Sequence, residues 1–309
     1  MTSKQVHDIV LILLLASSSR SASGGAADNE AHSCAGFYFR QLTVGVDIAR
    51  PSTSRGAAED QLFALAAQMK NFVYVFGDLE GGVAAVVDGT WDVRGIERIV
   101  NEDGLNLTAA IATHFHWDHI GSAAVERFGG LAIPGIRELA ALPSVAHVHV
   151  PRWELDAAAK QTQCAREALT ALDESTTIEI GRFVASFTHT PGHSPGSVCI
   201  AVSEREASAA ASAAASSASA SGSACGGEAL LLITGDTLFP GSCGRLDLPG
   251  SDARVMYDSL RKLSDGRFKD DLTVYPGHSY GGASSTIGRE RTNGLLREMT
   301  RGEWNRRMV

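Results

Sequence analysis

Short apolar runs separated by polar turns fill most of the chain, and their lengths predict β-strands. The runs are rich in apolar or β-branched side chains and are bounded by Gly, Pro or Asp, which is typical of strands in a buried sheet. These runs are predicted as strands: Phe72–Phe76, Val83–Asp88, Ala109–Thr113, Ala146–Val150, Phe183–Thr188, Ser197–Val202, Ala229–Ile233 and Leu272–Tyr275.

Three other segments are predicted as helices, each followed by a glycine that ends it: Val93–Glu102, Ser122–Phe128 and Ala253–Ser264. In the third, apolar residues recur near the helical period, and Asp252 precedes them as a candidate N-cap. Strands mixed with helices along the whole chain predict an α/β or α+β fold in which helices cover the sheets.

Two segments depart from this pattern. Residues 9–16 form a short apolar run followed by Ser, Ala and Gly, which is the shape of a secretory signal peptide. The acid-free, Ser-rich stretch after it also suits an organelle-targeting segment, so we expect residues 1–35 to be targeting-like or disordered. The location would then be the secretory pathway or an organelle, and otherwise the cytoplasm. Residues 203–227, a run of Ala and Ser, are expected to be a loop insertion in one domain spanning 36–309.

Composition narrows the class of protein. The 309 residues include 35 acidic and 27 basic side chains, giving a formal net charge of −8. This balance disfavours a surface that neutralises nucleic-acid phosphates. No apolar run reaches the roughly 18 residues that a membrane-spanning helix requires. These exclusions leave a globular protein, and its ten histidines are the natural candidates for its chemistry.

The densest group of potential metal ligands directly follows the predicted strand Ala109–Thr113. The segment THFHWDH at 113–119 contains the four candidate ligands His114, His116, Asp118 and His119. Imidazole and carboxylate suit zinc, iron or manganese better than calcium. A polar turn bonded to backbone explains one such histidine more readily than four ligands in this order, so the segment predicts a metal site.

Three further turns each place one candidate ligand after a predicted strand. They are TPGHSPGS with His193, GDTLF with Asp236, and YPGHSY with His278. Each turn is a weak signal alone, because Gly-Asp and Pro-Gly-His turns occur in many folds. Together with the first group they provide enough ligands for two metals if one carboxylate is shared. The glycines beside them allow the backbone to approach a metal centre closely.

These motifs, in this order, resemble the metallo-β-lactamase superfamily and are most similar to glyoxalase II (hydroxyacylglutathione hydrolase). The resemblance implies an αββα sandwich with a metal site at one edge of its two sheets. It also implies two divalent ions, with zinc expected and iron or manganese as alternatives. The implied ligands of the first ion are His114, His116, His193 and Asp236, and those of the second are Asp118, His119, His278 and the same Asp236.

A centre of this kind implies a metal-dependent hydrolase. Two divalent metals lower the pKa of a bridging water, and the metal-bridging hydroxide attacks a carbonyl without a Ser or Cys nucleophile. Asp118 and Asp236 are the residues expected to act in catalysis. The resemblance makes a small acyl thioester, such as a glutathione conjugate, the expected substrate. Tyr280 matches a tyrosine that contacts glutathione in that family, with packing on the sheet as the alternative. Arg245 can pair with a substrate carboxylate, or alternatively with Asp247.

Other functions stay open beside the thioesterase. Persulfide dioxygenase is a glyoxalase II-like relative that uses one iron, and the chain is similar to it in the Cys-Gly-Arg-x-Asp run at 243–247. There, His114, His193 and Asp236 would hold the iron. A non-catalytic metal-binding relative is a second alternative. β-Lactamase activity is a lesser one, because the superfamily fold does not fix the reaction.

Overall fold

The computed structural model of the protein describes residues 34–50, 57–205 and 227–308. The predicted N-terminal segment lies almost entirely outside the described residues, and so does most of the Ala/Ser-rich insertion. The expectations for both segments therefore stay predictions.

Two six-stranded sheets make up the centre of the fold. The first contains, in order across the sheet, β1 (Phe37–Thr43), β2 (Phe72–Asp78), β3 (Val83–Val87), β4 (Asn106–Ile111), β7 (His147–Pro151) and β8 (Leu169–Leu172). The second contains, in order, β14 (Ser285–Thr286), β13 (Thr273–Pro276), β12 (Ala229–Gly235), β11 (Val198–Glu204), β10 (Phe183–His189) and β9 (Thr177–Ile180).

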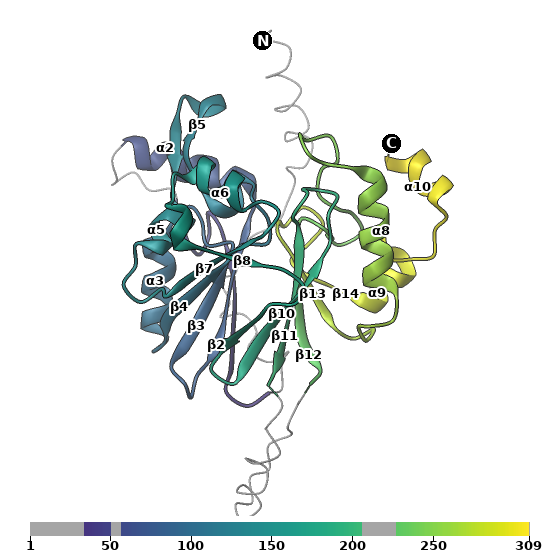
Figure 1. The fold of residues 1–309 in the computed structure, drawn as a ribbon, viewed down its shortest axis with the longest axis horizontal. Helices are drawn as coiled ribbons and strands as arrows, with labels where there is room; N and C mark the ends of the chain where they lie inside the picture. Colours follow the sequence, from purple (N-terminus) through teal and green to yellow (C-terminus); the bar gives the residue numbers. More distant parts are fainter. Residues whose placement is uncertain (1–33, 51–56, 206–226, 309) are drawn as a thin grey trace, which may run out of the picture. The chain divides into compact units, whose positions relative to one another are not determined.

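Helices cover the outer face of each sheet, which gives the predicted αββα sandwich (Figure 1). The helices beside the first sheet include α3 (Val93–Glu102), α5 (Ile136–Ala140) and α6 (Leu155–Thr162). Those beside the second are α8 (Ala253–Ser264), α9 (Ile287–Asn293) and α10 (Arg301–Met308). The other elements are the helices α2 (Ala57–Met69) and α4 (Trp117–Ile120), the strands β5 (Ser122–Val125) and β6 (Leu131–Ile133), and the 3₁₀ turns η1 (Glu126–Phe128) and η2 (Arg166–Ala168).

Three apolar clusters fill the spaces between the four layers. Successive residues of β2 alternate between two of them, because neighbouring side chains of a strand point to opposite faces. Val73 and Val75 pack beneath the helices of the first sheet, whereas Tyr74 and Phe76 lie between the two sheets. A third cluster joins the second sheet to the C-terminal helices and includes Trp304. Burial on both faces explains the nearly continuous apolar runs in the sequence.

The direction of the strands brings the polar loops to one edge of the sandwich. β10 and β12 both run antiparallel to β11, and β12 and β13 are parallel, so β10, β12 and β13 share one direction. Their carboxyl ends therefore lie at the same edge of the second sheet. The pairing of β11 with β12 is also the hairpin in which the insertion was expected to lie.

Two of the three predicted helices are confirmed with the predicted bounds, as α3 and α8. Asp252 caps α8 by accepting hydrogen bonds from the backbone nitrogens of Arg254 and Val255. Asp92 caps α3 in the same way through Gly95. Because a side-chain acceptor satisfies amides that lack partners inside the helix, these caps define where both helices begin.

The prediction of a helix at Ser122–Phe128 is wrong. The segment forms β5 followed by η1, and β5 pairs with β6 in a small antiparallel hairpin. The glycines that were expected to end a helix make the hairpin turn instead, since Gly129 and Gly130 both have a left-handed φ, at 71° and 82°. Gly121 turns the chain similarly before the segment, with φ at 83°.

His149 in β7 is expected to make the protein less stable in mild acid. Val148 and Val150 face the helices, so His149 faces the second sheet, and its Nδ1 atom has no hydrogen-bond partner among the described residues. Burial, with a smaller effect from His147, lowers the pKa of His149 from 6.5 to about 4. Between these values the unfolded chain binds a proton that the folded chain does not, so the free energy of unfolding falls as the pH decreases.

The expected loss reaches up to about 3 kcal/mol at the lower pH. Urea unfolding of the wild type and of His149→Phe from pH 7 to pH 4 measures it, and the variant should lose less stability over this range. Equal losses in the two proteins would show that His149 is not the cause.

Within the described ranges, no helix is both long and apolar enough to cross a membrane.

Candidate metal centre

The THFHWDH loop leaves the end of β4 and is fixed at its first residue by a buried carboxylate. Asp88 accepts hydrogen bonds from the backbone nitrogen of Thr113, at 2.8 Å, and from its hydroxyl, at 2.7 Å. The same carboxylate accepts from Nδ1 of His119, also at 2.8 Å. Asp88 was not singled out from the sequence, where it is only the last residue of a predicted strand. Its positive φ of 54°, which Asp tolerates better than most residues, is visible only in the structure.

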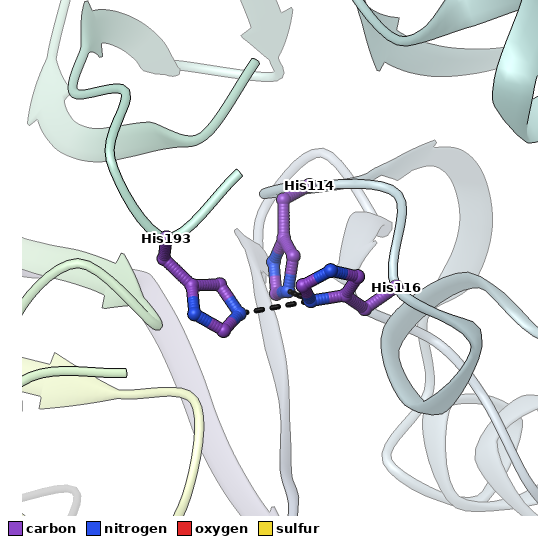
Figure 2. A group of neighbouring side chains, drawn as sticks. All are labelled: His114, His116 and His193. Carbon is purple, nitrogen blue, oxygen red and sulfur yellow. Dashed lines mark hydrogen bonds between the residues drawn. The ribbon is translucent and has the colours of Figure 1, made fainter. Parts of the chain in front are cut away.

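His114, His116 and His193 form the first ligand group (Figure 2). Nδ1 of His116 lies 3.1 Å from Nε2 of His114 and 2.8 Å from Nε2 of His193. Nitrogens bound to one tetrahedral zinc ion at about 2.0–2.1 Å are themselves separated by about 3.4 Å. Three imidazole nitrogens from two distant loops therefore lie close to the spacing that a single ion requires.

Asp118, His119 and His278 form the second ligand group. Nε2 of His278 lies 3.2 Å from Nε2 of His119 and 3.4 Å from an oxygen of Asp118. All three side chains are buried. Asn71, a residue that the sequence did not suggest, donates to the same Asp118 oxygen at 3.2 Å and accepts from the indole of Trp91. Asn71 thus holds the carboxylate in place from outside the group.

Asp236 lies between the two groups. Its Oδ2 atom is 3.3 Å from Nε2 of His193 and 3.5 Å from Nε2 of His278, and its Oδ1 atom is 3.5 Å from Nε2 of His119. Oδ1 is buried and accepts no hydrogen bond from the residues that the structure describes. A buried carboxylate oxygen without a donor is costly unless a cation satisfies it.

Gly277 shows how closely the backbone surrounds this carboxylate. A Cβ atom at that position would lie 2.3 Å from Oδ1 of Asp236, so only glycine leaves the oxygen its space. The structure thus brings together all the residues predicted to hold metals, and their donor set of imidazoles and carboxylates fits zinc, iron or manganese.

Hydrogen bonds on the far side of four imidazoles aim their Nε2 atoms into the site. In each case Nδ1 is bonded to a fixed oxygen: His114 to Thr113, His119 to Asp88, His193 to the carbonyl of Arg245 and His278 to the carbonyl of Met69. Such bonds select the tautomer with a free Nε2 and are typical outer partners of metal-binding histidines.

The charges in the site favour a bound cation. Burial lowers the pKa of His114, and it lowers the pKa of His116 to about 4, so both imidazoles are neutral. Burial opposes ionisation of Asp118, but His119 and His278 outweigh it and lower the pKa of that carboxyl. Burial also disfavours a charged His119, yet Asp236, Asp118 and Asp88 raise the pKa of this imidazole to about 10. The surplus of carboxylates around it is the environment that a metal ion neutralises.

A cavity of about 570 Å³ opens onto the two groups. Apart from the ligands, most of its wall is apolar: Met69, Phe115, Trp117, Phe239, Leu248 and Pro249. Cys243 also lines the cavity, and burial raises the pKa of its thiol to about 12, so it stays protonated.

The two residues predicted to bind substrate also line this cavity. The Tyr280 ring stacks on His278 at 4.7 Å between centroids, and its hydroxyl donates to the carbonyl of Met69 at 2.9 Å. Arg245 forms the alternative ion pair, with hydrogen bonds of 2.9 and 2.8 Å to Asp247. Both partners of this pair are largely exposed to solvent.

Comparisons with known proteins find a family profile that matches part of the chain and several similar proteins. Residues 70–207 match the sequence profile of the Metallo-beta-lactamase superfamily. A probable polyketide biosynthesis zinc-dependent hydrolase of Bacillus subtilis, PksB, is 29% identical over 211 residues, which cover 68% of this chain and 74% of that protein. The human mitochondrial persulfide dioxygenase ETHE1 is 25% identical over 223 residues, covering 72% of this chain and 69% of that protein.

Solved structures share the fold at lower sequence identity. A metallo-β-lactamase from Staphylococcus aureus has a TM-score of 0.63 and 22% identity, covering 88% of this chain and 67% of its own. ETHE1 from Myxococcus xanthus has a TM-score of 0.56 and 23% identity, covering 88% and 89%. The chain therefore has the metallo-β-lactamase fold, and residues 70–207 within it match the profile of that superfamily. The narrower resemblance to glyoxalase II stays a prediction.

Proposed function

We propose that the protein is a metal-dependent hydrolase of small acyl thioesters, with glutathione conjugates as the expected class. The observation that carries the proposal is the position of Asp236 between two complete ligand groups, with a buried oxygen that accepts no hydrogen bond within the described residues. Among the relatives, PksB is named a zinc-dependent hydrolase, which supports zinc as the metal and hydrolysis as the reaction.

The carboxylates and histidines of the site have different proposed roles. Two divalent ions, when bound, lower the pKa of water and supply hydroxide for attack on a carbonyl. Asp236 fixes the separation of the two ligand groups, and Asp118 keeps the second group anionic with the help of Asn71. The hydrogen bonds to Nδ1 of four histidines hold their metal-facing Nε2 atoms in place before substrate arrives. Little reorganisation of these side chains is therefore needed during the reaction.

The cavity supports a substrate with an apolar body. Its apolar wall excludes water from the scissile carbonyl, and Tyr280 and Arg245 are proposed to contact the substrate. Arg245 can hold a carboxylate of a glutathione conjugate with two parallel hydrogen bonds if it exchanges Asp247 for the substrate.

Persulfide dioxygenase is the second candidate, favoured by the similarity to human ETHE1. That reaction would use His114, His193 and Asp236 to hold one iron. The second group of Asp118, His119 and His278 is nevertheless complete and buried in this chain. A complete second group supports the two-metal hydrolase as the first candidate.

Thiol release tests the proposed function. The zinc-loaded protein is incubated with S-lactoylglutathione and with a series of simple acyl thioesters, and free thiol is followed with a colorimetric reagent. We expect turnover of at least one thioester. Absence of thiol release across the series, or oxygen uptake by the iron-loaded protein on glutathione persulfide, would overturn the proposal.

A further inference from the structure

A buried carboxylate outside the metal groups joins the two loops that provide the first group. Glu154 lies between β7 and α6 and is only 2% exposed. Its backbone is fixed at both sides, since its nitrogen donates to the carbonyl of Pro151 and its carbonyl accepts from the nitrogen of Ala158. The side chain therefore extends from a rigid point of the first sheet.

The two carboxylate oxygens of Glu154 accept from different loops. Oε2 accepts from the backbone nitrogen of Phe115, at 2.9 Å, and Phe115 stands between His114 and His116 in the sequence. Oε1 accepts from the backbone nitrogen of Gly196, at 2.7 Å, in the turn that carries His193. Elsewhere the loops are joined at their bases by a backbone hydrogen bond from Val198 to Thr113.

Gly196 leaves the space that the Glu154 side chain needs for this contact. A Cβ atom on Gly196 would lie 2.6 Å from Cγ of Glu154, a distance at which one of the two residues must move. Burying a carboxylate costs free energy unless its oxygens are hydrogen-bonded, and Glu154 receives those bonds from the ligand loops themselves. An apolar residue in its place would leave the backbone nitrogens of Phe115 and Gly196 without this acceptor, so the carboxylate satisfies both loops at once.

We propose that Glu154 is a positioning residue that holds the His114–His116 loop and the His193 loop at the separation that the first metal requires. The inference rests on the metal centre of the proposed function. It extends that function by naming the residue that couples two ligand loops far apart in sequence. Outer partners of metal ligands typically contribute a factor of about 10–100 in metal affinity.

Gln161 in α6 provides a matched comparison. Its side-chain amide donates to the carbonyls of Phe115, at 2.9 Å, and Gly121, at 3.0 Å, so it supports only the first of the two loops. A residue that merely stiffens the THFHWDH loop should affect both metal groups, because that loop supplies ligands to both. Glu154 should affect the first group more strongly than the second, since it alone of the two residues also holds the His193 loop.

The experiment measures zinc affinity rather than turnover. Glu154→Gln is made in two backgrounds, His278→Ala, which leaves the first group intact, and His193→Ala, which leaves the second. Zinc affinity is measured by competition with a chromophoric chelator. We expect Glu154→Gln to weaken zinc binding about 10-fold or more in the first background and less than about 3-fold in the second. Glu167→Gln, at an exposed position, makes the same chemical change and should alter neither affinity.

A second variant reaches the same contact from the other loop. Gly196→Ala should displace the Glu154 carboxylate and weaken zinc binding in the His278→Ala background by a similar factor, while Gln161→Leu should affect the two backgrounds equally. Melting temperatures of the metal-free proteins show whether any variant loosens the whole fold. If His278→Ala binds no measurable zinc, Glu154→Gln is tested in the protein without a background substitution. As the chelator competes for zinc, this variant should lose one of its two ions before the other.

Unchanged zinc affinity in Glu154→Gln, or equal weakening in both backgrounds, would overturn the positioning role. Failure of the proposed function would give a different result. In that case the wild-type protein would bind zinc, and this binding would depend on Glu154, but no thiol would be released. The metal centre would then stand, and the proposed thioesterase activity would not. A wild-type protein that binds no zinc would overturn both.

Discussion

Asp236→Ala is expected to lower kcat/KM for thioester hydrolysis by about 10³-fold, equivalent to about 4 kcal/mol of transition-state stabilisation. Asp236 lies between the two ligand groups, and its Oδ2 atom is 3.3 Å from Nε2 of His193 and 3.5 Å from Nε2 of His278. In the proposed centre, its removal would take a ligand from both ions at once. His114→Ala should have an effect of the same kind through the first ion alone.

Initial rates of thiol release measure the effect, with zinc content determined on the same samples. The fold should remain, because the three apolar clusters do not involve Asp236. Asp156→Ala is a suitable control, since it removes only a surface ion pair with Arg166 and such pairs contribute about 0–1 kcal/mol. Asp236→Ala with activity close to that of the control would contradict the assigned role.

Removal of the metals is expected to abolish hydrolysis and to lower the melting temperature while leaving the protein folded. Without cations, Asp118, Asp236 and Asp88 crowd the same buried site around His119. Bound ions stabilise the native state by mass action, by about 4 kcal/mol when zinc is present at about 1,000 times its dissociation constant.

Dialysis against a strong chelator, elemental analysis and calorimetry before and after re-addition of zinc measure both effects. Activity should return with zinc. Full activity in protein shown to be free of metal would rule out a metal mechanism.

Much of the fold is predictable from the sequence, because its central elements carry local signals. The two-sided burial of β2 produces the continuous apolar run at Phe72–Phe76, and Asp252 with the helical spacing after it defines α8. The four-residue strands β8 and β9 were not predicted, since runs this short have little pattern of their own. The hairpin of β5 with β6 was read as a helix because its turn glycines resemble a helix stop.

The site is predictable to the extent that its chemistry lies in contiguous motifs. The predicted ligands occur in four short segments with unusual spacing, and the structure brings these segments together at one edge. Asp88, Asn71 and Glu154 were not found, because each is a single polar residue whose role comes from a contact made across the fold. Arg245 is a case that the sequence left open between substrate binding and an ion pair with Asp247. The structure shows the ion pair with this near neighbour.

Metal content measured together with turnover tests the central claim most directly. Purified protein is analysed for zinc, iron and manganese, and the same preparation is assayed with S-lactoylglutathione. Two complete ligand groups sharing Asp236 predict about two divalent ions per chain, with zinc expected, and release of thiol in proportion to their occupancy. A single iron per chain, with oxygen uptake on glutathione persulfide and no thiol released from S-lactoylglutathione, would contradict it.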